Sequence, residues 1–192
     1  MPVRKVLTTP NQKLHLKSRR LTPSEIGSTK TKTIISDVYD TLRAGEYGVG
    51  MSAIQVGEPI AACVVMIRPT PNRPNLEHFD RVYFNPEIIK TFDTKVPMWE
   101  GCCSVLDDNG DPVYAEVPRY RKIKVRYYDE SSCEHIEIVD GFLAHVLQHE
   151  IDHINGTIFT DLVPLSNTIS LEEYRKNVNK ISPNGLLFIP GG

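Results

Sequence analysis

The chain has 192 residues, of which 40% are hydrophobic and 24% charged, and its formal net charge at pH 7 is −2. This size and apolar content are typical of one folded unit with its own core, so we expect a single domain over residues 1–192. The small, evenly mixed charge argues against electrostatic binding of nucleic acid. No apolar run approaches the roughly 20 residues that span a bilayer, which predicts a soluble protein without membrane contact.

The first residues carry no targeting signal that we recognise. Met1–Val6 is followed by polar residues, without the apolar segment of a signal peptide or the long Ser- and Arg-rich extension of an organelle transit peptide. Four cysteines are also too few and too irregularly spaced for a disulfide framework in a chain of this length. We therefore expect a cytoplasmic protein, of bacterial rather than organellar origin.

The N-terminal third is predicted to hold an irregular arm, one helix and a glycine-rich loop. Residues 1–23 are polar with scattered leucines and form the arm. Apolar residues then recur at helical spacing from Ile34 to Leu42, which predicts a helix that ends near Gly45. The segment from Gly48 to Gly57 follows, and it is a weak candidate for a nucleotide loop because it lacks the G-x-G-x-x-G pattern and a strand before it.

The middle of the chain is predicted to be mainly strands. Residues 61–67 and 82–89 are strand candidates, and the proline-containing segment 68–80 is a loop between them. After a second loop at 107–112, segments 122–129 and 134–139 alternate in polarity and predict an antiparallel hairpin. Residues 170–180 are predicted to be helical, and residues 165–192 form a C-terminal helix and tail whose role the sequence leaves open.

The segment Gln148–His153 reads Gln-His-Glu-Ile-Asp-His, an H-E-x-x-H pattern. On a helix, His149 and His153 lie one above the other on one face, so both imidazoles can reach one divalent ion. Glu150 lies on the flank of that face, within reach of water at the ion. Asp140 as N-cap and Gly156 as the stop are consistent with a helix between them.

Two histidines four residues apart on an apolar helix are more often core residues than ligands. A glutamate directly after the first histidine reverses this balance, because burying a carboxylate beside two imidazoles is costly without a function. The pattern therefore predicts a metal site whose third ligand comes from elsewhere. The fold we expect is α+β, with short antiparallel β-sheets packed around a central metal-binding α-helix.

Three segments in this order resemble motifs of the peptide deformylase family. They are Gly-Val-Gly-Met-Ser-Ala-Ile-Gln at 48–55, Glu-Gly-Cys-Cys-Ser at 100–104, and the helix motif at 148–153. The likeness extends from the first helix to about Pro164. An H-E-x-x-H pattern alone occurs in many metallopeptidases, whereas the three motifs together are highly specific.

The resemblance implies a metal-dependent hydrolase with Cys102, His149 and His153 as ligands of one divalent ion. Three protein ligands leave a fourth position for water, as in catalytic rather than structural sites. The resemblance implies Fe²⁺ as the native ion, and this donor set also accepts Zn²⁺, Ni²⁺ or Co²⁺.

The resemblance also implies the reaction, which is removal of the N-terminal formyl group from the formyl-methionine of newly synthesised proteins. Glu150 would act as general base on the water and then as the acid that protonates the departing amine. The side-chain amide of Gln55 and the backbone N–H of Cys103 would donate to the oxyanion. The substrates would be formyl-Met nascent peptides, with a possible contact to the ribosome near the exit tunnel.

The substrate-binding residues that the resemblance implies are fewer and less specific. Val49, Phe142 and Val146 are candidate walls of an apolar pocket for the methionine side chain. The backbone of Val49 and Gly50 could pair with an extended peptide, and Arg119 could bind it further along. Each of these residues is equally compatible with an ordinary core or surface position.

Two residues depart from the family pattern, and one further histidine lies close to the motif. Ser52 replaces a usual alanine, a small-for-small change that we expect to be tolerated. Cys103 replaces a usual leucine, which raises the question of redox sensitivity and of which sulfur binds the metal; the register with Glu100 favours Cys102. His145 lies four residues before His149, and we expect it to be a pocket wall or a structural residue.

Two other functions remain open from the sequence. An H-E-x-x-H metallopeptidase that cleaves internal peptide bonds would take its third ligand from after the helix, where Asp161 is the nearby candidate, and would leave Cys102 unexplained. A non-catalytic, metal-binding relative that serves as an interaction module would be expected to lose Glu150 or Gln55, and both are present.

Overall fold

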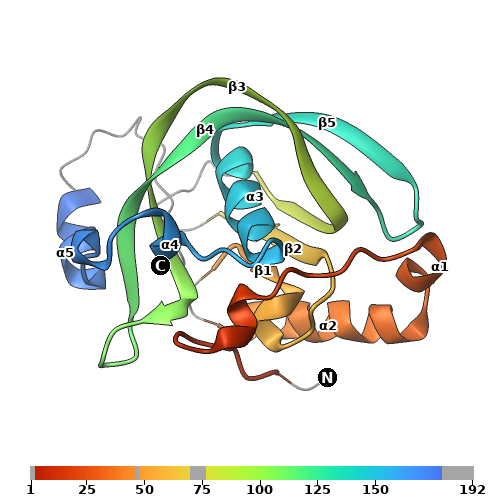
Figure 1. Cartoon of the computed structure of the whole chain (residues 1–192), viewed down its shortest axis with the longest axis horizontal. Helices are drawn as coiled ribbons and strands as arrows, with labels where there is room; N and C mark the ends of the chain where they lie inside the picture. The colour runs from red at the N-terminus through yellow and green to blue at the C-terminus, as the bar shows by residue number, and fades with distance from the viewer. Residues whose placement is uncertain (1–2, 46–47, 70–76, 179–192) are drawn as a thin grey trace.

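The computed structural model describes residues 3–45, 48–69 and 77–178 (Figure 1). The elements in chain order are η1 (Gln12–His15), α1 (Pro23–Ile26), α2 (Thr29–Ala44), β1 (Gly50–Ser52), η2 (Ala53–Val56), β2 (Ala62–Ile67), β3 (Phe79–Leu106), β4 (Pro112–Tyr128), β5 (Glu134–Asp140), α3 (Gly141–Ile154), α4 (Phe159–Leu162), η3 (Leu165–Asn167) and α5 (Leu171–Val178). Within these ranges the strands form one antiparallel sheet in the order β1-β2-β3-β4-β5. The predicted α+β class is confirmed.

Strands β3 and β4 are long and bent, and with β5 they arch over α3 (Figure 1). The pairing of β3 with β4 shifts register at four places along its length. Each such irregularity bends a strand and increases its twist, so the sheet can curve around the helix instead of lying flat against it. The expected arrangement of a sheet around a central helix is therefore present.

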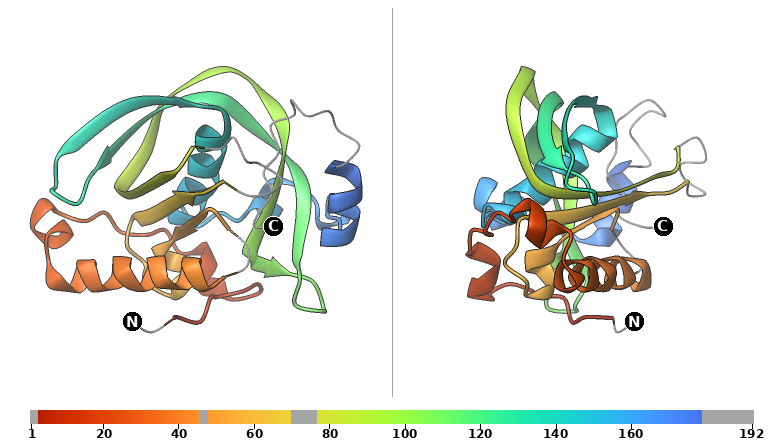
Figure 2. Two further views of the ribbon diagram at one scale, coloured as in Figure 1. Left: turned by 180° about the vertical axis from the view of Figure 1, so that it is seen from behind. Right: turned by 90° about the vertical axis from the view of Figure 1, so that its right-hand side faces the viewer.

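Strand β2 is buried on both faces and separates α2 from α3. Ala62, Val64 and Met66 pack into the same cluster as the apolar face of α2, whereas Cys63 and Val65 pack with α3. Because successive side chains of a strand point to opposite faces, one strand serves two cores. Figure 2 shows the same layering from two further directions, with α2 at the base and α3 inside the arch.

The main difference from the predicted fold is one continuous sheet in place of several short ones. The strand predicted at 82–89 is the beginning of the 28-residue β3. Prolines at 86 and 97 lie inside β3, the first within a register shift and the second opposite Pro118. A proline cannot donate to the ladder, so the sequence around Pro97 gives no sign that the strand predicted at 82–89 continues. Pairing around both prolines continues.

The two ends of the described chain pack onto the same body. In the arm, the N–H of Leu7 donates to the carbonyl of Gln55 and that of Thr9 to the carbonyl of Ser104. At the other end, Tyr174 of α5 is fully buried against Tyr114 of β4. In residues 3–45, 48–69 and 77–178, no helix has both the length and the apolar character needed to cross a membrane. Residues 179–192 of the predicted C-terminal helix and tail lie outside these ranges.

Candidate active site

Helix α3 forms where the sequence predicts it and carries the H-E-x-x-H segment inside the core. Asp140 is at the N-cap, although its side chain makes no capping hydrogen bond, and Asn155 closes the other end. Gly156 follows with φ of 79°, and a Cβ at this position would lie 2.5 Å from the carbonyl oxygen of His15. A glycine is therefore required both by the left-handed backbone and by the packed arm.

Three predicted ligands converge at one buried point. Nε2 of His153 lies 3.2 Å from Nε2 of His149 and 3.3 Å from Sγ of Cys102. The three ligand atoms all lie within 4.8 Å of one another. The histidines come from successive turns of α3, and Cys102 comes from β3, so the sheet supplies the ligand that the helix cannot.

The donor atoms of this cluster fit a divalent cation. With ligand bonds of about 2.1 Å for nitrogen and about 2.3 Å for sulfur, tetrahedral geometry gives separations of roughly 3.4 and 3.6 Å, close to the distances observed. Nδ1 of His149 lies 2.9 Å from a carboxylate oxygen of Glu100, so Nε2 is the ring nitrogen that faces His153. Two imidazole nitrogens this close repel unless a proton or a cation lies between them. Cys102, His149 and His153 therefore form a metal-binding cluster.

Glu100 connects the metal cluster to the surrounding core. It is fully buried, and its two oxygens contact Nδ1 of His149 at 2.9 Å and Nε2 of His145 at 3.0 Å. Burial raises the pKa of this carboxyl, but the charge of Arg119 and the hydrogen bonds from both histidines and Arg119 outweigh it and hold the pKa well below its usual range. Glu100 is therefore an anion that orients a ligand.

Arg119 is turned into the protein and engaged by two carboxylates. Its Nε and Nη2 donate to the two oxygens of Glu100, and its Nη1 donates to Asp152 at 2.5 Å. The side chain is only 6% exposed. The predicted contact of Arg119 with a peptide finds no support in this placement, because the guanidinium serves the buried network behind the ligands.

Glu150 lies between α3 and β1 and is almost fully buried. Its Oε2 accepts a hydrogen bond from the hydroxyl of Ser52 at 2.8 Å. A Cβ on Gly50 would lie 2.5 Å from its Oε1, so the glycine makes room for the carboxylate. Burial raises the pKa of Glu150 to about 7, against the opposing effects of His149 and of the hydrogen bond from Ser52.

Gln55 presents its amide nitrogen to the cysteine strand. Its Oε1 accepts from the backbone N–H of Ser52 at 2.8 Å, which orients Nε2 toward Oγ of Ser104 at 3.0 Å. The same nitrogen lies 3.4 Å from Sγ of Cys103 and 3.6 Å from Sγ of Cys102. The pairing of β3 with β4 is irregular between Gly101 and Leu106, the stretch that contains both cysteines.

The three predicted pocket residues are all associated with one apolar cluster. Val146 is buried in the same apolar cluster against which Val49 and Phe142 pack while partly exposed. The carbonyl of Val49 accepts from the N–H of Met66. His145 is fully buried against Glu100, in agreement with the structural alternative predicted for it.

The alternative third ligand, Asp161, serves other groups. Its Oδ2 accepts from the backbone N–H of Ile158 at the start of α4 and lies 3.6 Å from Nδ1 of His15. In the described residues, the third possible ligand beside His149 and His153 is Cys102 and not Asp161. The metallopeptidase hypothesis therefore lacks the third ligand that it requires.

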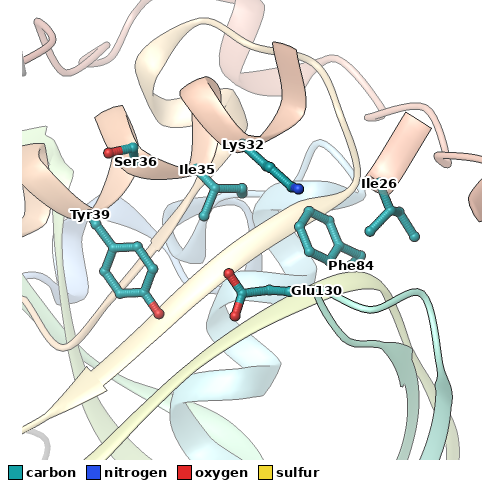
Figure 3. A pocket seen from close by; sticks show the side chains of 7 residues that line it. All are labelled: Ile26, Lys32, Ile35, Ser36, Tyr39, Phe84 and Glu130. Atoms are coloured by element: carbon teal, nitrogen blue, oxygen red, sulfur yellow. The ribbon is translucent and has the colours of Figure 1, made fainter. Parts of the chain in front are cut away.

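A separate cavity of about 270 Å³ opens near α2 and contains none of the predicted site residues (Figure 3). Its lining residues are Ile26, Lys32, Ile35, Ser36, Tyr39, Phe84 and Glu130. We assign it no part in the chemistry of the metal cluster.

Sequence reasoning missed two residues that shape this site, Glu100 and Ser52. Each lies two residues from a predicted site residue on the same strand, Glu100 before Cys102 and Ser52 after Gly50. Residues two apart on a strand share a face. This spacing could have identified both residues from the sequence, because a polar residue that shares a strand face with a buried site residue needs a hydrogen-bond partner there.

Comparison with known proteins agrees with this geometry. The family model described as polypeptide deformylase matches residues 3–168. A peptide deformylase of Leptospira biflexa is 36% identical over 168 residues, covering 84% of this chain and 88% of the relative. One of Rhodopseudomonas palustris is 30% identical over 191 residues, covering 99% and 98%.

Solved structures give the same result. A class I type b peptide deformylase of Acinetobacter baumannii with Met-Ala-Ser bound has a TM-score of 0.76 and 28% identity, covering 84% of this chain and 99% of that one. The peptide deformylase of Ehrlichia chaffeensis has a TM-score of 0.74 and 27% identity, covering 93% and 98%. With the Cys-His-His cluster in place, this chain belongs to the peptide deformylase family, the metal-binding hydrolases that remove the formyl group from nascent peptides.

Proposed function

We propose that Glu150, Gln55 and the backbone N–H of Cys103 carry out the deformylation of formyl-methionine at the N-terminus of nascent peptides. The observation that supports this assignment is the convergence of three side chains from three elements. The Gln55 amide lies 3.6 Å from the Cys102 sulfur, and the Glu150 carboxylate is close enough to interact electrostatically with Cys102 and His149. Peptide substrates are consistent with the Met-Ala-Ser bound in the Acinetobacter baumannii structure.

In the proposed mechanism, the cluster of Cys102, His149 and His153 would hold a divalent ion that polarises the formyl carbonyl and makes a water molecule easier to deprotonate. Glu150 accepts the proton as the water oxygen bonds to the formyl carbon. The carboxyl group then returns that proton to the peptide nitrogen as the carbon–nitrogen bond breaks. Formate and a free amino terminus leave the site, and Glu150 is again a carboxylate.

Gln55 and Cys103 stabilise the negative charge that develops on the formyl oxygen. Support for Gln55 comes from Ser52, whose N–H occupies Oε1 and so leaves the Nε2 hydrogens facing the cysteines. Support for Cys103 comes from the irregular pairing of β3 around it, which suits an N–H that serves a ligand rather than the ladder. Loss of one such donor typically costs about 3–4 kcal/mol of transition-state stabilisation.

Val49, Phe142 and Val146 are proposed to receive the methionine side chain, and the backbone of Val49 and Gly50 to align the peptide. Val146 belongs to a buried apolar cluster, and Val49 and Phe142 pack against that cluster while remaining partly exposed. An apolar wall of this kind suits a flexible thioether side chain.

We propose Fe²⁺ as the native ion and the cytoplasm as the site of action. A thiolate with two imidazoles accepts Fe²⁺, Zn²⁺, Co²⁺ or Ni²⁺, so the choice follows from the family resemblance and not from ligand softness. Elemental analysis of protein isolated without oxygen tests the metal. Because the substrates are nascent chains, we also propose contact with the ribosome near the exit tunnel, which co-sedimentation with ribosomes would test.

The experiment that tests the catalytic assignment is formate release from a formyl-Met peptide. Protein is purified without oxygen, reconstituted with Fe²⁺ or Ni²⁺, and compared with Glu150→Ala and Gln55→Ala. We expect turnover to disappear in Glu150→Ala and kcat to fall about 10²- to 10³-fold in Gln55→Ala. Wild-type protein that binds metal but releases no formate from varied formyl peptides would instead support a non-catalytic role.

A further inference from the structure

The hydroxyl of Ser52 makes a contact that an alanine at this position could not make. Its Oγ lies 2.8 Å from Oε2 of Glu150 and 2.9 Å from the backbone carbonyl of the same residue. Ser52 is fully buried, so no solvent competes for the hydroxyl proton. The carbonyl lies inside α3 and has a helical partner four residues on, whereas the carboxylate is the stronger acceptor.

Gly50 and Ser52 together form a seat for the Glu150 carboxylate. The two residues face the same side of β1, toward α3. Gly50 leaves the space that Oε1 fills, since a Cβ there would lie 2.5 Å from that oxygen. Ser52 supplies the donor for Oε2. Space and a hydrogen bond from one strand thus define where each oxygen lies.

Among the described residues, Ser52 is the one whose side chain donates a hydrogen bond to the Glu150 carboxylate. A glutamate side chain has three rotatable bonds, and a buried carboxylate without a fixed donor can occupy several of the resulting conformations. A group that must accept and return a proton at one place works best when it is held there before the reaction.

We propose that Ser52 is a positioning residue for Glu150, whose hydroxyl holds the carboxylate in the one conformation that faces the reacting water. The inference rests on the proposed role of Glu150 as the proton-transferring group. It assigns a function to one of the two residues at which this chain departs from the family pattern, the serine in place of a usual alanine. Within the described ranges, the two hydroxyl contacts of Ser52 are both to Glu150 and not to Cys102, His149 or His153.

The first test compares kinetics of Ser52→Ala with wild type. Removing the hydroxyl is expected to lower kcat about tenfold and to leave KM within about twofold, because the bond to a charged group is lost and substrate contacts are not. Ser18→Ala is the matched control. It also removes a buried serine hydroxyl, one that has no hydrogen-bond partner in the described residues, and it should leave kcat unchanged.

The pair Ser52→Thr and Ser52→Val separates the hydroxyl from side-chain size. The two introduced side chains have nearly the same shape, and only the first keeps the donor. We expect Ser52→Thr to have a kcat at least fivefold above that of Ser52→Val. This comparison also decides the question if Ser52→Ala does not fold, and equal kcat values in the two variants would overturn the inference.

Two measurements without turnover complete the test. Crystal structures of metal-free wild type and Ser52→Ala should show Glu150 in one conformation in the first and displaced or multiple in the second. Titration with Co²⁺, followed by thiolate-to-cobalt absorption, should give the same affinity in both within about threefold. An unmoved Glu150 together with unchanged kcat would overturn the role of Ser52, whereas turnover by Glu150→Ala would overturn the proposed mechanism itself.

Discussion

Nδ1 of His149 lies 2.9 Å from Oε2 of Glu100, so a carboxylate on β3 determines which nitrogen of this ligand faces the metal cluster. The same strand carries Cys102 two residues later. Strand β3 therefore supplies Cys102 as a ligand and orients the ligand His149 through the side chain of Glu100. The buried charge of Glu100 is in turn balanced by Arg119.

We predict that Glu100→Gln weakens metal binding about 10- to 100-fold. The amide keeps the size of the side chain but removes the charge that favours an N–H on Nδ1 of His149 and a lone pair on Nε2. Competition with a chromogenic chelator measures the change. Glu87→Gln removes a carboxylate that pairs with Arg126 far from the ligands and should leave affinity unchanged. Equal affinity of Glu100→Gln and wild type would contradict the orienting role.

We predict that Gly50→Ala abolishes most of the activity while metal affinity stays within about threefold. The added Cβ would lie 2.5 Å from Oε1 of Glu150, so the carboxylate must move away from its seat on β1. The backbone of Gly50 needs no left-handed conformation, so the effect is steric. Formate release and metal titration test the two halves of the prediction.

Gly27→Ala is the matched control for this substitution. A Cβ at Gly27 would have no neighbour closer than 3.9 Å, and its φ is −72°. We expect full activity. Comparable losses in both variants would show that any added methyl group disturbs the fold and would remove the support for a seat around Glu150.

The parts of the site that the sequence predicts are those that repeat a local pattern. The helix around His149 follows from apolar spacing and from Gly156 at its end, and both features are read within a few turns. The ligand set was reached only through the resemblance, because the approach of Cys102 to α3 depends on the curvature of β3. Register shifts that produce such curvature leave no clear periodic signal.

The partners of the polar residues could not be predicted in the same way. Arg119 is far from Glu100 in the sequence and meets it only because β3 and β4 pair across a proline-containing stretch. For the same reason the sequence left it open whether Arg119 binds a peptide or takes an ordinary core or surface position, whereas its guanidinium lies in the interior. Likewise, Ser52 looked like a tolerated small residue until α3 brought Glu150 against it.

We predict that the stability of the metal-free protein falls between about pH 4.5 and pH 7 because of Glu150. Burial raises the folded-state pKa of this carboxyl to about 7, above its unfolded value, so the folded state holds the proton more tightly. The cost of ionising the buried carboxyl is absent when the pH is below the unfolded-state pKa. It grows as the pH rises and reaches its full size above the folded-state pKa. The integrated effect is roughly 3 kcal/mol in the free energy of unfolding.

Urea unfolding of metal-free wild type and Glu150→Gln at pH 5 to 8 isolates this contribution. The amide does not titrate, so the difference in unfolding free energy between the two proteins should change in favour of the variant as the pH rises. A difference that stays constant over this range would mean that Glu150 ionises in the folded protein as it does in the unfolded chain.

We predict from the packing of Tyr174 that α5 stabilises the fold without contributing to the chemistry of the active site. The ring is fully buried and stacks on Tyr114 with centroids 4.3 Å apart, and Trp99 packs against its edge at 5.6 Å. Removing a buried aromatic side chain costs about 3–5 kcal/mol. Tyr174→Ala should therefore lower the free energy of unfolding by that amount, measured by urea denaturation.

The kinetic parameters distinguish a stabilising helix from a catalytic one. Below its unfolding transition, Tyr174→Ala should keep the kcat and KM of wild type, because Tyr174 belongs to one apolar cluster with Tyr114 and Trp99, whereas the ligand Cys102 belongs to another. Lys176→Ala, on the exposed face of the same helix, should change neither stability nor kinetics. A loss of kcat in folded Tyr174→Ala would instead connect α5 to the active site through β4, since Tyr114 of that strand lies opposite Gly101, the residue next to Cys102.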